Sequence, residues 1–289
     1  MTELTIKTMY DLDFEYTEFV NAEHPVSLDL SKWLPSLGIG RDAVRPLVPG
    51  ELAFILGDTG TGKTSCLQNI AMYANPLPTL MCELELPGTL CFERFAAMAL
   101  GAQCRDVERQ YKMRPAYVRL EAEEYVKDII SKLGHVAVCD HSRLDEYALE
   151  SLIMKHYPEK LGHQPAVVIV DYIGLMESKG AKRYERVSRA AEELKRTAKN
   201  TNTIMICASQ IHRGQDDDEG GEVFLHSAKD SGSIENSAGL LLGLWRDDDD
   251  KRKLYVKVLK NTKGEGGKVV TCNFDGARMT ITEMARGVE

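Results

Sequence analysis

The chain has 289 residues, of which 43% are apolar and 28% charged, and its formal net charge is −8. This size and composition are typical of a folded soluble protein with one large core, and they argue against a disordered chain or two full-sized domains. The negative charge argues against a protein that coats nucleic acid with its whole surface, although it is compatible with a local basic groove.

No apolar run approaches the roughly 20 residues that cross a membrane. The N-terminus also lacks a basic patch leading into an apolar stretch. We therefore expect a protein of the cytoplasm, or of the host cytoplasm if its source is a virus, with no membrane partner. Acidic residues gather at 216–219 and 247–250, in runs typical of solvated loops, so much of the net charge is expected away from the functional site.

Residues 1–45 lack a strong hydrophobic period, and we expect a partly ordered N-terminal arm or linker there, followed by one domain over 46–289. Short apolar runs then alternate with segments of helical periodicity, which is typical of βαβ units and a mainly parallel sheet. The expected strands are 52–56, 79–84, 135–139, 166–170 and 203–208, and the expected helices are 90–100, 122–133, 144–156 and 187–200. Three further strands, 239–245, 254–260 and 268–274, lack intervening helices and predict an antiparallel C-terminal extension.

Residues 57–64 read G-D-T-G-T-G-K-T and match the phosphate-loop pattern G-x-x-x-x-G-K-[ST] between a strand and a helix. A glycine-rich turn lets several backbone N–H groups converge on phosphate oxygens, and the following helix adds its positive N-terminal end. Lys63 is expected to reach the β- and γ-phosphates, and the Thr64 hydroxyl to bind Mg²⁺. The alternative is a glycine-rich structural turn. The expected nucleotide-binding residues are Gly57, Asp58, Thr59, Gly60, Thr61, Gly62, Lys63, Thr64 and Ser65.

Polar residues follow three of the expected strands. Asp171 closes the strand at 166–170 and suits the water shell of Mg²⁺, although a helix cap also fits. Glu83 and Glu85 lie two apart at the end of another strand and share a face if the chain is extended. Either carboxylate suits a base facing the γ-phosphate; Glu85 is preferred, and Glu83 is alternatively a surface partner of a lysine.

Gln210 follows the strand at 203–208 and is placed to report the γ-phosphate by hydrogen bonding, unless it is a loop amide bonded to backbone. The ATPase hypothesis thus requires ATP and Mg²⁺ as ligands. It also requires that the ends of four expected strands meet at one site.

The order of these motifs resembles the RecA-like motor domain of DnaB-type replicative helicases. Matching segments are E-L-E-L-P at 83–87 with Arg94 (family S-L-E-M), V-I-V-D-Y-I-G-L-M at 168–176 (I-V-D-Y-L-Q-L-M) and A-S-Q-I-H-R at 208–213 (L-S-Q-L-N-R). The segment K-D-S-G-S-I-E-N-S-A at 229–238 is similar to R-E-S-G-S-I-E-Q-D-A, which the wider RecA-like superfamily does not share. The resemblance covers about 26–283 and implies an α/β, RecA-like P-loop NTPase with a twisted sheet flanked by helices.

The resemblance further implies a ring, usually of six subunits, that encircles single-stranded DNA and hydrolyses nucleotide at subunit boundaries. It favours Glu85 as the base and Gln210 as the γ-phosphate sensor. It places Lys229, Asp230 and Gly232 on a central loop that touches DNA phosphates, Asp230 through its backbone. Two further candidates for the channel are Arg183 and Arg186, for which a solvated helix start is the alternative.

Two departures from the family pattern stand out. The family's trans-acting K-x-R, set by one subunit against its neighbour's γ-phosphate, reads Lys260-Asn261-Thr262 here, with Lys263 as a possible substitute for the arginine. The family's collar domain, which receives primase, has no room in residues 1–45, and residues 7–22 are expected to dock on a neighbouring subunit as the family's linker helix does. A helicase loader or primase is an expected partner.

Three functions are therefore compared. The leading one is a DnaB-like, ATP-dependent helicase or translocase on single-stranded DNA in replication. The others are a RecA- or RadA-like recombination or repair ATPase, and a nucleotide-dependent assembly or regulatory protein that hydrolyses weakly because Thr262 replaces arginine.

Overall fold

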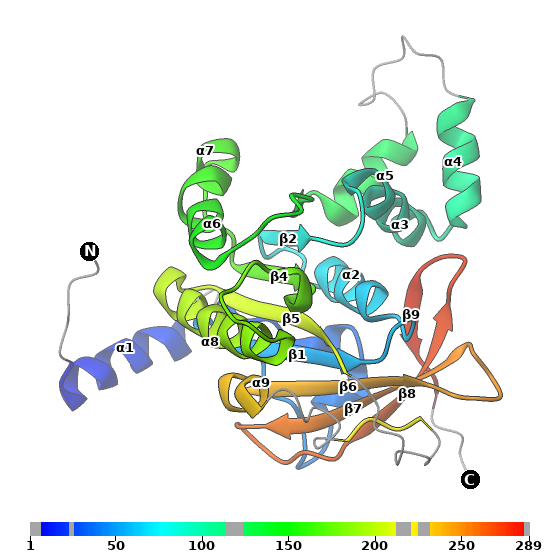
Figure 1. Cartoon of the computed structure of the whole chain (residues 1–289). Helices are drawn as coiled ribbons and strands as arrows, with labels where there is room; N and C mark the ends of the chain where they lie inside the picture. The colour runs from blue at the N-terminus through cyan, green and yellow to red at the C-terminus, as the bar shows by residue number, and fades with distance from the viewer. Residues whose placement is uncertain (1–6, 23–25, 114–123, 212–220, 225–231, 286–289) are drawn as a thin grey trace.

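A computed structural model describes residues 7–22, 26–113, 124–211, 221–224 and 232–285 (Figure 1). Its strands are β1 (Leu52–Gly57), β2 (Thr79–Glu83), β3 (Val136–Cys139), β4 (Val167–Asp171), β5 (Ile204–Gln210), β6 (Leu240–Arg246), β7 (Lys253–Asn261), β8 (Val269–Asp275) and β9 (Thr280–Glu283). Within these ranges they form one sheet in the order β3-β2-β4-β5-β1-β6-β7-β8-β9. All neighbours from β3 to β6 are parallel, whereas β6 to β9 pair antiparallel. The predicted parallel sheet with an antiparallel extension is confirmed.

Helices cover both faces of the sheet. The α-helices of the described residues are α1 (Met9–Asn21), α2 (Lys63–Tyr73), α3 (Gly88–Leu100), α4 (Cys104–Lys112), α5 (Glu124–Leu133), α6 (Glu146–Ser151), α7 (Tyr157–Leu161), α8 (Arg183–Thr201) and α9 (Gly232–Ser237), and all but α1 pack against the sheet. One core lies between the sheet and α2 to α5, and the other lies between the sheet and α6 to α9. Strands β1, β2 and β4 are buried along their whole length, because helices cover both sides, and this explains their uninterrupted apolar runs.

Some boundaries differ from the sequence prediction. The expected helix at 144–156 is α6, a π-helical turn at Leu152–His156, and α7, while α8 begins four residues before the expected start at 187. Helix α4 was not predicted because it is short and mostly polar: Val107 is its only fully buried residue, and Cys104 and Tyr111 are only partly buried against the core. Strand β9 follows β8 after a tight turn and was also missed.

The segment before the phosphate loop has two parts. Helix α1 buries no residue and stands apart from the sheet in Figure 1. The chain from Leu28 to Leu47, expected to be only partly ordered up to residue 45, instead joins the main core. Trp33 Nε1 donates to the Ile281 carbonyl at 3.0 Å, which ties this segment to β9. The packing therefore continues across the expected boundary at 45.

None of the described helices is both long and apolar enough to span a membrane. All seven cysteines are free. Among the described residues, no group of three or more His, Cys, Asp and Glu side chains has a geometry that could hold a metal ion.

The burial of residues 28–47 predicts a measurable share of stability. Leu34 is completely buried, whereas Ile39, in the same segment, is 63% exposed. We expect Leu34→Ala to lower the free energy of unfolding by about 2–5 kcal/mol, because it removes buried methyl groups and leaves a cavity. The matched control Ile39→Ala should change it by less than about 0.5 kcal/mol. Urea unfolding followed by circular dichroism measures both; equal effects would show that the segment does not belong to the core.

Candidate nucleotide-binding site

The carboxyl ends of the central strands meet at one edge of the sheet. Gly57 on β1 pairs with Gln210 on β5, and Glu83 on β2 pairs with Asp171 on β4. Because these strands are parallel, the polar residues that follow them emerge side by side. They surround a pocket of about 460 Å³, to which Lys63, Thr64, Glu85 and Gln210 all contribute.

The phosphate loop closes around the carbonyl oxygen of Asp58. The Thr61 hydroxyl donates to this oxygen at 2.9 Å and Lys63 Nζ at 2.7 Å. Gly62 has φ +106°, a left-handed conformation that favours glycine. At Gly57 a Cβ atom would lie 2.8 Å from the Thr61 hydroxyl and 3.0 Å from the Leu244 carbonyl oxygen. These two glycines are therefore required by the backbone path, and α2 begins immediately after the loop.

Lys63 is the cation that the phosphate loop itself contributes to the pocket. Burial lowers its pKa, and the nearby Asp171 carboxylate opposes this shift. Its ammonium group donates to the Asp58 carbonyl inside the loop. The oxygens of a bound phosphate would offer this ammonium group an alternative acceptor.

Asp171 closes β4 and is almost completely buried. Burial raises the pKa of its carboxyl group to about 6, an effect opposed by a hydrogen bond from the side chain of Thr64. Its second oxygen, Oδ2, is buried without a hydrogen-bond partner in the described structure. A carboxylate with an unused oxygen beside a threonine hydroxyl is an all-oxygen donor set, which fits Mg²⁺ and its water shell.

The two candidate bases have different environments. Glu85 follows β2, is exposed and lines the pocket. Glu83 is completely buried, which rules out the alternative role of a surface partner for a lysine. Burial, followed by the neighbouring Asp171 carboxylate, raises the pKa of Glu83 to about 7. Of the two carboxylates, only Glu85 therefore lines the pocket.

Gln210 connects the phosphate loop with the start of α8. Its amide group donates to the Thr59 hydroxyl, and its carbonyl oxygen accepts from Arg183 Nη2 at 3.3 Å. Both of these partners are side chains, so the alternative of a loop amide bonded to backbone does not fit. Arg183 and Arg186 are both exposed in the first turns of α8, and only Arg183 is joined to the pocket.

Arg246, at the end of β6, was missed by sequence reasoning. Its Nε donates to the Thr61 carbonyl at 3.1 Å and its Nη1 to the Lys251 carbonyl at 3.2 Å. The guanidinium also lies 4.3 Å from the centre of the Phe274 ring. A signal existed for Arg246, because it is the first charged residue after the apolar run of a central strand.

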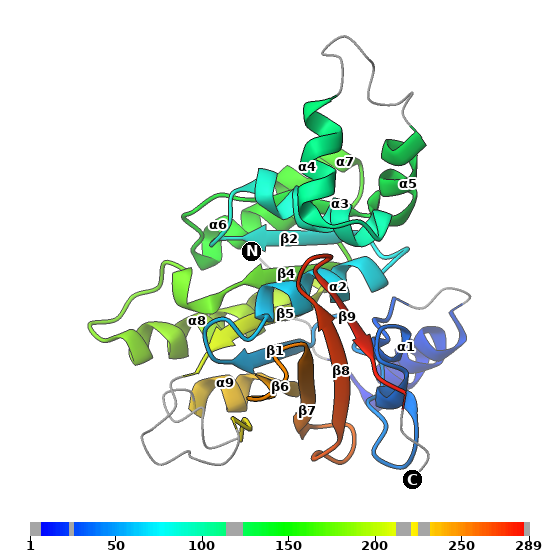
Figure 2. The same cartoon turned by 90° about the vertical axis from the view of Figure 1, so that its right-hand side faces the viewer.

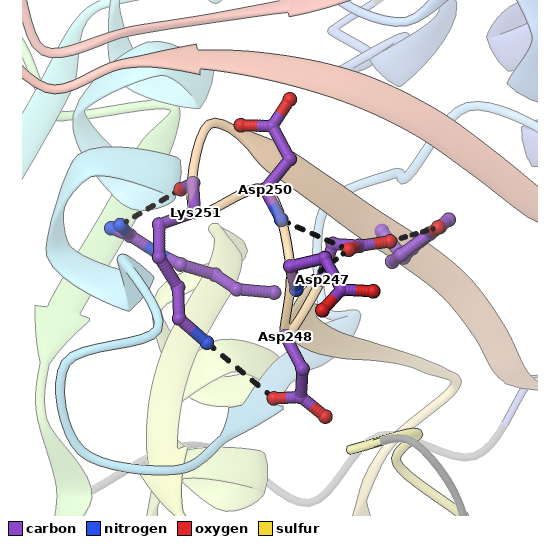
Figure 3. A network of polar contacts seen from close by, with 7 residues as sticks. Asp247, Asp248, Asp250 and Lys251 are labelled. Atoms are coloured by element: carbon purple, nitrogen blue, oxygen red, sulfur yellow. Dashed lines mark hydrogen bonds and ion pairs between the residues drawn. The ribbon is translucent and has the colours of Figure 1, made fainter.

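The acidic turn after Arg246 lies closer to the site than expected. Figure 3 shows Asp247, Asp248, Asp250 and Lys251 gathered in this turn. Asp247 Oδ1 accepts the backbone N–H of Asp250 at 3.1 Å, and Lys251 Nζ donates to Asp248 Oδ1 at 3.4 Å. The run at 247–250 is thus a structured turn joined through Arg246 to the phosphate loop, and its charge is not remote from the pocket. The run at 216–219 lies outside the described residues.

The C-terminal hairpin adds pocket residues that gave no local signal, namely Phe274, Gly276 and Met279. Arg94 and Tyr172, which lie in segments that match the family pattern, also line the pocket. Met279 accepts from the Ser65 hydroxyl through its sulfur at 3.7 Å, across 214 residues of sequence. Figure 2 shows the β8–β9 hairpin standing beside α2.

The expected trans-acting residues lie apart from this pocket. Lys260 Nζ donates to the carbonyl of Glu235 on α9. Lys263 Nζ forms an ion pair with Glu51 at 2.6 Å, and the Thr262 hydroxyl donates to the Gly239 carbonyl at 3.1 Å. All three side chains are therefore bonded within their own subunit.

The expected DNA-contacting loop is only partly described. Gly232 is exposed at the first position of α9. Lys229 and Asp230 lie outside the described residues, so their contacts stay a prediction.

A phosphate loop at the start of α2, together with this strand order, gives the chain the fold of RecA-like ATPase domains. The chain belongs to the DnaB-like helicase C-terminal domain family, whose model matches residues 42–283. In fold it is similar to the ATPase domain of G40P, with a TM-score of 0.77 at 18% identity over 96% of this chain and 99% of that one. The RadB recombinase gives a TM-score of 0.54 at 14% identity, covering 89% and 97% of the two chains.

Curated relatives agree with the family match. The replicative DNA helicase DnaB of Mycoplasma genitalium is 27% identical over 241 residues, which is 76% of this chain and 50% of the relative. DnaB of Buchnera aphidicola subsp. Schizaphis graminum is 26% identical over 212 residues, or 70% of this chain and 43% of the relative. The chain thus spans about half the length of the curated relatives it matches.

The position of Arg246 yields a test of the pocket. We expect Arg246→Ala to weaken ATP binding roughly tenfold, because the phosphate loop loses a charge-assisted hydrogen bond at Thr61. Fluorescence titration with a labelled ATP analogue measures the affinity. Lys251→Ala is the matched control, because Arg246 bonds to the backbone of Lys251 and this carbonyl is retained. Identical affinities in the two variants would remove Arg246 from the binding site.

Proposed function

We propose that the chain is the ATP-driven motor of a ring-forming DNA helicase that moves along single-stranded DNA in replication. The observation that carries the proposal is the convergence of the phosphate loop, Glu85 and Gln210 on one pocket in a DnaB-like chain. The buried Asp171 is joined to this pocket by its hydrogen bond with Thr64. The family match also supports the helicase assignment over a RecA- or RadA-like recombination or repair role.

ATP is the proposed substrate. The loop N–H groups and Lys63 hold its phosphates, while Thr64 and Asp171 hold the water shell of Mg²⁺. When bound, Mg²⁺ neutralises charge that develops on the phosphate oxygens. Glu85 takes a proton from the attacking water, whose oxygen bonds to the γ-phosphorus as the bond to the β–γ bridging oxygen breaks. ADP and phosphate leave as products.

The bonds of Gln210 supply a route from nucleotide to DNA. Gln210 contacts Thr59 in the phosphate loop and Arg183 at the start of α8. A γ-phosphate that engages the Gln210 amide competes with these contacts and releases or redirects Arg183. We propose that Arg183 and Arg186 contact DNA phosphates together with Lys229, Asp230 and Gly232 on the central loop. Such contacts are sequence-independent and weaken with salt.

Assembly into a ring, which we take to be hexameric, is supported by α1. This helix exposes large apolar side chains, among them Tyr10 and Phe14, and buries none in its own subunit. An apolar face of this kind is stabilised by docking on another surface, and a neighbouring copy of the chain is the proposed one. One solved DnaB-like replicative helicase, similar in fold with a TM-score of 0.73 at 18% identity, is described with its interactions with primase. Primase or a loader is accordingly a proposed partner here.

ATP hydrolysis with and without single-stranded DNA tests the motor. We expect DNA to stimulate hydrolysis severalfold in the oligomeric fraction from a sizing column. Lys63→Ala should lower the rate at least 100-fold, because the triphosphate loses the half-buried cation of the phosphate loop. Lys127→Ala, which removes an exposed lysine on α5, is the control and should leave the rate unchanged. Nucleotide binding without DNA-stimulated turnover would argue for the regulatory function instead.

Lys263, the candidate substitute for the missing arginine, is paired with Glu51 of its own subunit. This pairing favours a test of the regulatory function, in which nucleotide bound at the subunit boundary is hydrolysed slowly. If a missing arginine limits the rate, Thr262→Arg should raise turnover of the assembled protein by about tenfold or more, because a guanidinium stabilises the transition state of phosphoryl transfer. Thr262→Gln, a neutral replacement, should leave turnover unchanged. A native protein that already turns over rapidly on DNA, with no gain in Thr262→Arg, would contradict this function.

A further inference from the structure

Glu83 is a buried carboxylate for which the proposed mechanism has no use. It ends β2 directly opposite Asp171 of β4 and has no exposed surface. The family pattern S-L-E-M, to which this segment is similar, has a serine at this position. Burial of an ionisable group costs free energy unless hydrogen bonds or an opposite charge compensate for it. The hydrogen bonds of Glu83 therefore indicate what its side chain does in the fold.

One oxygen of Glu83 organises the chain that leaves β2. Oε1 accepts the backbone N–H of Glu85 at 3.2 Å and that of Leu86 at 3.1 Å. A side-chain acceptor that bonds N–H groups two and three residues ahead fixes a turn in the same way as an aspartate or asparagine turn does. The turn fixed here carries Glu85 into the nucleotide pocket.

The other oxygen of Glu83 contributes no contact of this kind. Oε2 of Glu83 and Oδ2 of Asp171 are both buried without hydrogen-bond partners in the described structure. Two buried carboxylates opposite each other repel when both are charged. The fold therefore uses the length and acceptor geometry of the Glu83 side chain, while its negative charge is unfavourable.

We propose that Glu83 is a positioning residue, which holds Glu85 at the γ-phosphate by anchoring the backbone of the turn after β2. This inference rests on the proposed function, in which Glu85 is the base. Glu83 itself touches neither the substrate nor the attacking water.

Two conservative variants separate geometry from charge. Glu83→Gln keeps the side-chain length and an acceptor oxygen but removes the charge. Glu83→Asp keeps the charge but withdraws the acceptor by about one carbon–carbon bond, roughly 1.5 Å. Positioning requires that Gln substitutes for Glu83 and that Asp does not, whereas a role in binding a cation or in proton transfer requires the reverse. The same exchange at the base, Glu85→Gln, should abolish hydrolysis and serves as the comparison.

We expect Glu83→Gln to retain kcat within about twofold. In Glu83→Asp kcat should fall at least about tenfold, because displacing a catalytic group by about 1 Å costs up to 100-fold in rate. KM for ATP should change by less than about twofold in both variants, since the phosphate loop is untouched. A merely structural role would instead lower the unfolding midpoint and raise KM together with the loss of kcat. Active Glu83→Asp with inactive Glu83→Gln, or full activity in both, would overturn the proposal.

Amide hydrogen exchange provides a readout that needs no hydrolysis. The N–H groups of Glu85 and Leu86 should be protected in the native protein and in Glu83→Gln, and should exchange about tenfold or more faster in Glu83→Asp. Unchanged exchange in Glu83→Asp would overturn the proposal whether or not the protein hydrolyses ATP. Failure of the proposed function has a different signature: no DNA-stimulated hydrolysis in the native chain, with the exchange pattern as expected.

Discussion

The direction of the strands is the constraint on which the site depends. From β3 to β6 every neighbouring pair is parallel, so each strand delivers its carboxyl end to the same edge. Helices cover both faces and keep the central strands buried, and the polar site residues lie at or just beyond the carboxyl ends of the strands. The phosphate loop, the buried carboxylates and Gln210 therefore lie together without any one of them having to be positioned by a long loop.

At that edge, the pairing of β1 with β5 brings the phosphate loop next to Gln210. The register sets Gly57 beside Gln210, so the first residue of the phosphate loop and the last residue of β5 share a hydrogen-bonded row. Gln210 bonds to Thr59 on one side and to Arg183 on the other. A side chain with both donor and acceptor groups can exchange one set of partners for another at little cost, which suits a residue that responds to the γ-phosphate.

The sequence was sufficient for the parallel sheet and for the motifs at the strand ends, because buried parallel strands are continuous apolar runs and the phosphate loop has a fixed pattern. Other features had no local signal. Residues 28–47 pack deeply but in short turns without a regular period. Phe274 and Met279 reach the pocket only through strand pairing. The separate environments of Glu83 and Glu85 depend on where β2 ends and the turn begins, and spacing alone does not determine this.

The hairpin of β8 and β9 links the phosphate loop to the far end of the described chain. The amide of Asn69 on α2 donates to the Met279 carbonyl at 2.9 Å and accepts from the Ile281 N–H at 3.1 Å. Contacts between such distant segments are slow to form, because a long loop must close first. During synthesis the pocket therefore stays incomplete until the hairpin has been made. A nucleotide that contacts both the phosphate loop and the β8–β9 hairpin binds the completed fold more tightly than any partly folded chain. Its binding therefore stabilises the completed fold.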